Sequence, residues 1–166
     1  MPSPNTDGAL LLQNKNVVIY GGGGAVGGAI ARAFAREGAK IFLTGRTSAR
    51  LEPVAKDIIA AGGAAETAQV DALDDVAVEK HLAEVVRKHG GTDVSFNAIG
   101  LTPQQGIQGI ALTDLPVESF SLPVNTYTRG HFVTCARPAS GRPKRSMSCL
   151  TSMPKHTALR GNSFRR

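Results

Sequence analysis

Short apolar runs alternate with helical stripes of apolar residues over the first part of the chain. A β-branched run at residues 17–19 leads into a cluster of glycines, after which Val26, Ile30 and Phe34 recur about one helical turn apart. A second apolar run follows at residues 41–43. Short apolar runs predict buried strands, and apolar residues at helical spacing predict a helix with one face on a sheet. The pattern therefore predicts a strand-helix-strand unit with parallel strands and a right-handed crossover.

The alternation continues for two further rounds, and each predicted helix ends at glycine. Gly38 is expected to end the first helix in a left-handed cap. The second helix leads to a strand at residues 67–70, and the third, which Asp74 or Asp75 can cap, leads to a strand at residues 94–97. This order predicts an α/β fold, a Rossmann-like doubly wound parallel sheet in three αβα layers, truncated after about the fourth strand-helix unit.

The glycine cluster at residues 21–28 predicts a binding site for a dinucleotide. Glycine allows the backbone to turn tightly and to approach a pyrophosphate closely, and the helix that follows directs its free N–H groups and positive dipole end at that anion. The alternative is a glycine-rich hairpin or linker. We favour the dinucleotide site because linkers are not normally bracketed by a buried strand and an apolar helix at this spacing.

Residues 20–27 resemble the Thr-Gly-x-x-x-Gly-x-Gly loop of the short-chain dehydrogenase/reductase family. The first and last glycines of that loop match Gly21 and Gly27, and Ala25 replaces the middle one. An alanine adds a methyl group near the pyrophosphate, which bears on how tightly the dinucleotide is held. The resemblance places Gly24 and Val26 at the dinucleotide as well.

Three further positions extend this resemblance over about residues 12–136. The family's Asp after the third strand matches Asp71, and its Asn-Asn-Ala-Gly motif is present in degraded form from Asn97 to Gly100. These three residues are expected at the cofactor. The family's active-site Asn matches Asn125, which is the one catalytic candidate. Taken singly, each Asp or Asn is equally typical of a turn or a helix cap, so the order and spacing carry the resemblance.

The resemblance implies an NAD(P)-dependent oxidoreductase that acts on a small carbonyl or alcohol substrate. A lipid-like 3-oxoacyl group and a small ketone both remain open. Two alternatives are a dinucleotide-binding module without catalysis, such as a pseudoenzyme, and a nucleic-acid or anionic-surface binder. We do not expect nucleic-acid binding, because the basic residues form no helical face and have no interleaved aromatic residues.

The predicted turn after the second strand indicates which cofactor is preferred. Enzymes that prefer NAD usually have an acidic residue there for the ribose hydroxyls, whereas an arginine suits the 2′-phosphate of NADP. Residues 44–48 contain no acid, and Arg46 can pair with that phosphate. We therefore favour NADP (NADPH), with NAD as the alternative. The other interpretation of Arg46 is a solvated loop cation.

The residues that perform proton transfer in the family are not found in this chain. The resemblance requires a Tyr with a Lys four residues later and a Ser upstream. The chain has two tyrosines, Tyr20 and Tyr127, and the residues four positions later are Gly24 and His131. We expect this chain to be inactive as it stands. Serines are candidates for the family's Ser only by default: Ser146, Ser148 and Ser152.

The charge of the chain is divided unevenly. The formal net charge is +6, yet no Asp or Glu follows Glu118, and apolar periodicity ends near residue 138. We expect residues 1–137 to form an incomplete Rossmann domain and residues 138–166 to be a basic, disordered tail. A truncated gene or translation out of frame would explain such a tail.

The sequence also bears on membrane contact, cellular location, the state of the cysteines and metal binding. No run approaches the roughly 20 apolar residues of a membrane span, and no leader of the secretory type is present, so we expect a cytoplasmic protein without membrane contact. Cys135 and Cys149 are expected to be reduced thiols, and no metal site is expected. An intact family member is expected to be a homo-oligomer.

Overall fold

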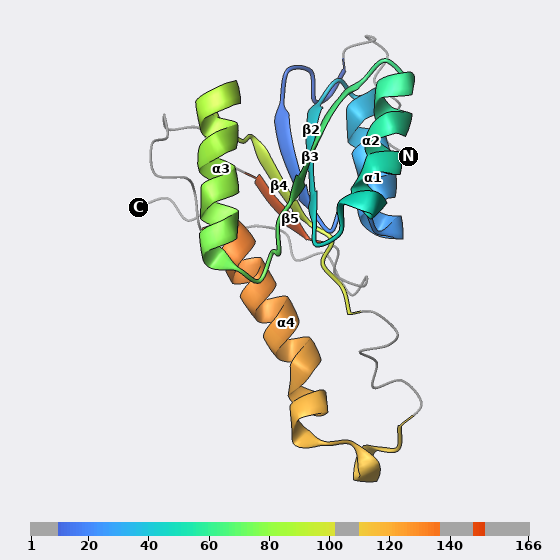
Figure 1. Cartoon of the computed structure of the whole chain (residues 1–166), viewed down its shortest axis with the longest axis vertical. Helices are drawn as coiled ribbons and strands as arrows, with labels where there is room; N and C mark the ends of the chain where they lie inside the picture. The colour runs from blue at the N-terminus through green and yellow to red at the C-terminus, as the bar shows by residue number, and fades with distance from the viewer. Residues whose placement is uncertain (1–9, 102–109, 137–147, 152–166) are drawn as a thin grey trace, which may run out of the picture.

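Five parallel strands form one sheet in the computed structural model, which describes residues 10–101, 110–136 and 148–151 (Figure 1). The order across the sheet is β3-β2-β1-β4-β5, and every neighbouring pair is parallel. The elements in chain order are β1 Asn16–Tyr20, α1 Ala25–Arg36, β2 Lys40–Gly45, α2 Ser48–Ala60, β3 Ala64–Gln69, α3 Asp75–His89, β4 Val94–Asn97, the 3-10 helix η2 Leu112–Asp114, α4 Val117–Ala136 and β5 Ser148–Thr151. The predicted Rossmann-like α/β fold is confirmed.

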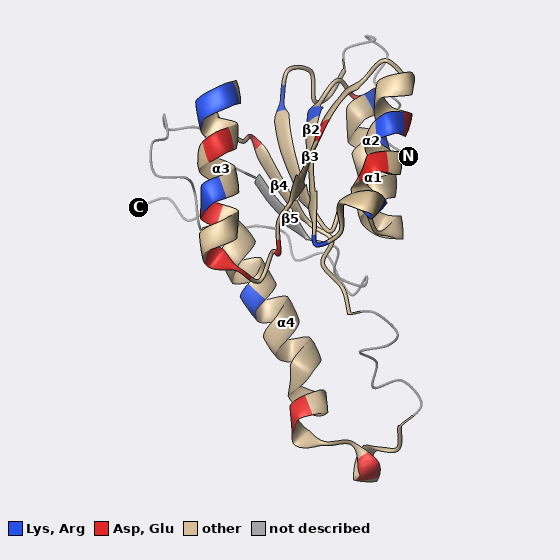
Figure 2. Cartoon of the chain, viewed as in Figure 1, with Lys and Arg blue, Asp and Glu red and all other residues tan. Residues whose placement is uncertain are grey.

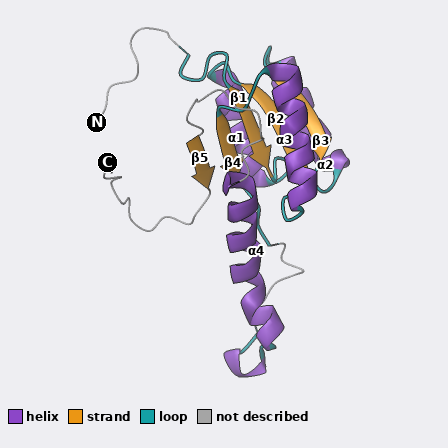
Figure 3. Ribbon diagram, turned by 90° about the vertical axis from the view of Figure 1, so that its left-hand side faces the viewer, coloured by secondary structure: helices purple, strands orange, loops and turns teal. Residues whose placement is uncertain are grey.

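Helices cover both faces of the sheet, with α1 and α2 on one face and α3 and α4 on the other (Figures 1 and 3). The central strand β1 is buried on both faces, because Val17 and Ile19 pack toward α1 and α2 whereas Val18 and Tyr20 pack toward α3 and α4. Alternate residues of a strand point to opposite faces, so an unbroken apolar run is required here.

The predicted helix ends are confirmed at the first and third helices. The carboxylate of Asp74 accepts hydrogen bonds from the backbone N–H groups of Val76 and Ala77, each at 3.0 Å, and so caps α3. Gly38 follows α1 with φ +82°, a left-handed conformation that glycine adopts without a steric penalty.

Strand β3 begins earlier than the sequence predicts. A strand was expected at residues 67–70, and the structure has it at Ala64–Gln69. β3 is an edge strand, and most of its side chains are exposed or half-buried, so burial does not impose an apolar pattern on it. Periodicity therefore cannot locate its bounds.

Strand β5 lies within the segment that was expected to be a disordered tail. Residues 148–151 pair in parallel with residues 94–97 of β4, so that expectation is wrong for these four residues. An open edge of β4 offers unpaired backbone N–H and C=O groups, which a short extended segment can satisfy whatever its side chains are. The rest of the predicted tail, residues 138–147 and 152–166, lies outside the described residues.

Cys135, in the last turn of α4, is disulfide-bonded, and the described residues include no free cysteine. The expectation of reduced thiols is wrong for this residue. The sequence contains no paired-cysteine motif that would have indicated this bond.

Polar contacts connect the strands to the last turn of α3 at the end of the sheet where the parallel strands begin. The Asn16 side chain donates to the carbonyl oxygens of His89 (3.0 Å) and Gly91 (2.8 Å). Glu66 on β3 accepts from Lys40 on β2 at 2.9 Å and lies 3.2 Å from Nε2 of His89. Burial raises the pKa of the Glu66 carboxyl, but the neighbouring Lys40 and His89 outweigh this effect and lower the pKa overall. These contacts hold the last turn of α3 against the sheet.

His81 lies on α3 above β3 and carries a ring nitrogen, Nε2, that is buried without a hydrogen-bond partner in the described part of the chain. Burial lowers the pKa of His81, and Lys88 lowers it further, whereas Glu84 and Glu66 act in the opposite direction. The folded protein therefore holds this imidazole in its neutral form more strongly than the unfolded chain does.

We expect the free energy of unfolding to decrease as the pH falls below about 6.5, the ordinary pKa of histidine. Below that pH the unfolded chain binds a proton at His81 that the folded protein resists, which costs at most about 1.4 kcal/mol per pH unit for one proton. Urea unfolding of the wild type and of His81→Gln at pH 7.5 and 5.5 tests this. The variant should lose less stability than the wild type over this interval; an equal loss in both would contradict the assignment to His81.

Candidate dinucleotide site

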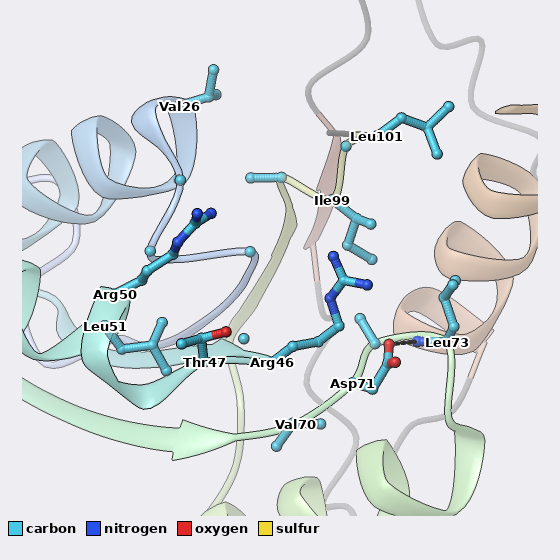
Figure 4. A pocket seen from close by; sticks show the side chains of 18 of the residues that line it. Val26, Arg46, Thr47, Arg50, Leu51, Val70, Asp71, Leu73, Ile99 and Leu101 are labelled. Carbon is cyan, nitrogen blue, oxygen red and sulfur yellow. Dashed lines mark hydrogen bonds between the residues drawn. The ribbon is translucent and has the colours of Figure 1, made fainter. Parts of the chain in front are cut away.

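A cavity of about 420 Å³ lies at the end of the sheet where β1, β2, β3 and β4 terminate (Figure 4). Ligands of open α/β sheets bind at this end, because the loops from neighbouring strands diverge there. The lining comes from the loop after β1, the loops after β2 and β3, the residues after β4, and α4. Five segments of the chain therefore share one site.

The glycine loop is shaped by close approaches between backbone segments. Gly21 has φ +76°, and a Cβ atom added to it would lie 2.7 Å from the carbonyl oxygen of Ala98. A Cβ atom added to Gly27 would collide with the carbonyl oxygen of Gly21 and would lie 2.9 Å from its carbon. Contacts this short exclude any side chain. Glycine at these two positions thus allows α1 to begin directly beneath the loop.

The first turn of α1 presents free N–H groups to the cavity. Gly24 is the N-cap residue and offers no side chain to cap the helix, and the first turn contains no acidic residue. Gly24, Ala25 and Val26 all line the cavity. Together with the positive end of the helix dipole, these groups form a site suited to a phosphate or another anion.

Two arginines extend into the same cavity from the region after β2. The side chains of Arg46 and Arg50 both project into it, and Thr47 lies between them along the chain (Figure 4). Arg46 is positioned through its backbone, since its carbonyl oxygen accepts from the Gln69 side chain at 3.0 Å. The sequence reasoning identified Arg46 and missed Arg50. No local motif marked Arg50, which lies in the first turn of α2 and lines the cavity through the packing of that helix.

Asp71 also lines the cavity and is the one acidic residue among its described lining residues. Its carboxylate oxygen Oδ1 accepts from the backbone N–H of Leu73 at 3.0 Å (Figure 4). This short-range bond shapes the turn that follows β3. The carboxylate therefore has a structural role in addition to the predicted contact with the cofactor.

Most of the residues predicted to bind the cofactor meet at this cavity. The lining includes Gly21, Gly24, Val26, Gly27, Arg46, Asp71 and Gly100. Asn97 does not line it. The Asn97 side chain is buried beneath the cavity, where it donates to the Thr134 hydroxyl at 3.1 Å and accepts from the backbone N–H of Ile99 at 2.9 Å.

The predicted catalytic Asn125 is exposed on α4 and does not line the cavity either. Leu122 and Thr126 of the same helix do. Residues three and four apart share a helix face, whereas adjacent residues do not, which explains why Asn125 and Thr126 differ. The role of Asn125 stays a prediction.

The structure places both tyrosines away from the cavity lining. Tyr20 is fully buried, its hydroxyl has no hydrogen-bond partner among the described residues, and burial raises its pKa well above the ordinary value. Tyr127 is exposed on α4, and its carbonyl oxygen lies 2.7 Å from Nδ1 of His131. Neither residue is among those that line the cavity. Ser146 and Ser152 lie outside the described residues.

The described residues offer neither a cluster of metal-ligating side chains nor a helix able to span a membrane. These residues contain no group of three or more His, Cys, Asp or Glu side chains that could hold a metal ion. No described helix combines the length and the hydropathy needed to cross a membrane.

Comparison with known proteins places this site in a family. The family model described as enoyl-(acyl carrier protein) reductase matches residues 23–163. The chain belongs to the short-chain dehydrogenase/reductase family. The match continues beyond residue 136, where the sequence resemblance was expected to end, and includes most of the predicted tail.

The individual relatives match this chain over about half of their own length. An uncharacterized oxidoreductase of Mycobacterium tuberculosis is 34% identical over 125 residues, which cover 75% of this chain and 46% of the relative. A short-chain dehydrogenase/reductase from Mycobacterium marinum superposes with a TM-score of 0.69 at 28% identity, covering 77% of this chain and 50% of the other. A metagenomic short-chain oxidoreductase in complex with NADP gives a TM-score of 0.66 at 27% identity, covering 75% and 55%. The chain thus spans about half the length of the curated relatives it matches.

We expect Gly27→Ala to disrupt the glycine loop, because the added methyl group would collide with backbone atoms that cannot rotate away. Overpacking of this kind typically costs about 1–3 kcal/mol. Gly100→Ala is the matched control, since a Cβ atom at Gly100 meets nothing within 4 Å. Chemical denaturation of the two variants should show a lower midpoint for Gly27→Ala and a nearly unchanged one for Gly100→Ala. Equal midpoints would show that the loop relaxes freely.

Proposed function

We propose that this family member binds a nicotinamide dinucleotide in the cavity at the carboxyl end of its sheet. The observation that supports this most directly is the glycine loop, whose backbone contacts bring the open N-terminus of α1 to the cavity. A dinucleotide supplies the pyrophosphate that such a helix end attracts. We propose that its reaction is hydride transfer between the nicotinamide cofactor and a small carbonyl or alcohol substrate.

We further propose a preference for NADP over NAD. Arg46 and Arg50 both reach the cavity beyond the end of β2, and no acidic residue lies in the turn between β2 and α2. A 2′-phosphate there would gain charge-assisted hydrogen bonds from guanidinium groups, whereas ribose hydroxyls would lack their usual carboxylate acceptor. The metagenomic relative, solved in complex with NADP, supports a cofactor of this class.

A second candidate function is dinucleotide binding without turnover. Two observations favour it for the residues present here: Tyr20 and Tyr127 both lie away from the cavity lining, and neither is followed by Lys four residues later. Carbonyl reduction needs a proton at the oxygen as negative charge develops, and positioned acid catalysis contributes about 100- to 10,000-fold.

Three further properties are also proposals: the substrate, the association of two copies and the cellular setting. The substrate is an uncharged carbonyl or alcohol, for which a 3-oxoacyl group and a small ketone are both candidates. Association of two copies is supported by α4, which carries few charged residues compared with α3 (Figure 2) and exposes large apolar side chains. The exposed apolar residues of this helix are Val117, Phe120, Val124, Tyr127 and Phe132. We propose a cytoplasmic setting for this protein.

We expect NADPH to bind more tightly than NADH, and Arg46→Asp to remove this difference. Loss of a hydrogen bond to a charged group costs about 1.5–3 kcal/mol, so the affinity for NADPH should fall about 10- to 100-fold while that for NADH changes little. Fluorescence titration of each cofactor measures both affinities. Arg87→Asp, which makes the same charge change at an exposed position of α3, is the control and should keep the preference. An unchanged preference in Arg46→Asp would contradict the proposal.

We expect the 166-residue chain to bind NADPH without oxidising it. The assay follows NADPH absorbance with saturating cofactor and a panel of ketones and 3-oxoacyl thioesters, next to a full-length relative as a positive control. No rate above that of the protein-free reaction is expected. Turnover that tracks the concentration of the folded protein would show that another residue, such as His131, delivers the proton.

A further inference from the structure

Arg129 on α4 reaches the turn that joins β3 to α3. Its Nε donates a hydrogen bond to the carbonyl oxygen of Leu73 at 2.9 Å. The backbone N–H of Leu73 donates to Oδ1 of Asp71 at 3.0 Å. Leu73 is therefore held at its N–H by Asp71 and at its carbonyl group by Arg129, and both Leu73 and Asp71 line the dinucleotide cavity. The Arg129 bond thus links α4 to one wall of the site.

Gly130, the next residue of α4, lets the helix lie close to the same wall. A Cβ atom added to Gly130 would lie 3.0 Å from Cδ1 of Ile99 and 3.5 Å from Cδ2 of Leu73. Ile99 also lines the cavity. A side chain larger than hydrogen would therefore press on two lining residues at once, and glycine keeps α4 near enough for Arg129 to bond to Leu73.

The first half of α4, residues 117–128, is hydrogen-bonded mainly within itself. In the described part of the chain, the hydroxyl groups of Ser121 and Thr128 donate to carbonyl oxygens one turn earlier, at 3.0 and 2.6 Å. The end of the helix instead bonds to β4 through Thr134. Figure 1 shows the first half of α4 extending beyond the sheet. Segments with few contacts outside themselves open at low free-energy cost.

This half of the helix nevertheless supplies part of the cavity wall. Leu122 and Thr126 line the cavity, and Thr126 is buried. A ligand that extends from the turn after β3 to these two residues contacts both of the segments that the Arg129 bond joins. The order of α4 and the shape of the cavity therefore depend on each other.

We propose that Arg129 is a positioning residue that couples the turn after β3 to α4, so that a dinucleotide bound against Asp71 also orders residues 117–128. This inference rests on the proposed function, which places the dinucleotide in the cavity. Arg129 does not itself line the cavity, so it acts through Leu73. A ligand binds more tightly to segments that are already held in place, because less conformational freedom is lost on binding.

The chemistry of the guanidinium group suits this link. A hydrogen bond from a cation to a carbonyl oxygen is stronger than one between neutral groups. Arg129 forms no ion pair with an Asp or Glu among the residues that the structure describes, so no carboxylate there competes with the carbonyl group of Leu73. Because the bond holds a turn and does not contact the ligand, it should affect NADPH and NADH equally.

Titration of both cofactors against the 166-residue chain tests the role of Arg129. Arg129→Met keeps an unbranched side chain but removes the donor, and loss of one such bond should weaken NADPH and NADH alike by about 3- to 10-fold. Arg129→Lys should restore most of the affinity, because an ammonium group can also donate to a single carbonyl oxygen. Arg87→Met, the same change at an exposed position of α3, should leave both affinities unchanged.

Two results of this titration would overturn the proposal. Unchanged affinities in Arg129→Met would show that the bond does not position the site. A loss for NADPH alone would make Arg129 a contact of the 2′-phosphate. If Arg129→Met does not fold, Arg129→Gln, whose side chain is too short to span the same gap, replaces it.

Hydrogen exchange separates positioning from a general loss of stability. NADPH should slow amide exchange at residues 21–27, 71–74 and 117–128 of the wild type. In Arg129→Met it should still slow exchange at residues 21–27 but no longer at residues 117–128. A merely destabilised variant would exchange faster throughout and would keep this pattern of ligand protection. Equal protection of residues 117–128 in both proteins would overturn the coupling.

Exchange without ligand keeps this inference distinct from the proposed function. If the wild type binds neither NADPH nor NADH, the proposed function fails. The link itself is then decided by the free proteins, in which Arg129→Met should exchange faster than the wild type at residues 71–74 and 126–130 and equally at β1. Equal exchange at both of these segments would show that Arg129 does not join them.

Discussion

The close backbone packing around Gly21 is the constraint on which the rest of the site depends. Its α-carbon lies against the backbone of Ala98, after β4, and its carbonyl group lies against the α-carbon of Gly27 in α1. One residue thus joins the end of β1, the end of β4 and the start of α1. Because backbone atoms cannot change rotamer, any side chain at Gly21 or Gly27 would separate these elements. The loop can pack in this way because Gly21 and Gly27 each carry a hydrogen atom in place of a side chain.

The two ends of the sheet differ in how their polar groups are paired. At the end where the strands begin, Asn16, Asp93 and His89 connect β1, β4 and α3 through backbone-directed hydrogen bonds. At the other end, the strands lead into loops whose N–H groups and arginine side chains are directed into the cavity. At the first end these polar groups pair within the chain, whereas at the second end polar groups face the cavity, as is typical of a ligand site.

The sequence predicted those parts of the fold in which burial or chain geometry restricts the residue type. The strands at residues 17–19, 41–43 and 94–97, the Asp74 cap and the left-handed Gly38 all follow from such restrictions. It could not locate β3 or β5, because an edge strand is held largely by backbone hydrogen bonds that carry no sequence signal.

The same distinction applies to the site. The glycine loop, Arg46 and Asp71 have local signatures, and the structure brings them together at one cavity. Arg50 enters the site only because α2 begins beside the glycine loop: a Cβ atom on Gly23 would lie 2.8 Å from Cβ of Arg50. Asn97, whose predicted contact with the cofactor stays a prediction, is buried and accepts a hydrogen bond from the backbone N–H of Ile99. Such roles depend on packing between segments, which no local motif encodes.

Binding and chemistry are separable in a fold of this type. The residues that we propose to hold the dinucleotide lie on the loops after β1 to β4 and on the start of α1, all within the described part of the chain. Binding draws on the helix dipole and on fixed positive charge, neither of which needs a proton to move. Hydride transfer additionally needs a group whose pKa is matched to proton exchange near neutral pH. Burial shifts the pKa of Tyr20 further from that range, so Tyr20 is unsuited to exchange this proton.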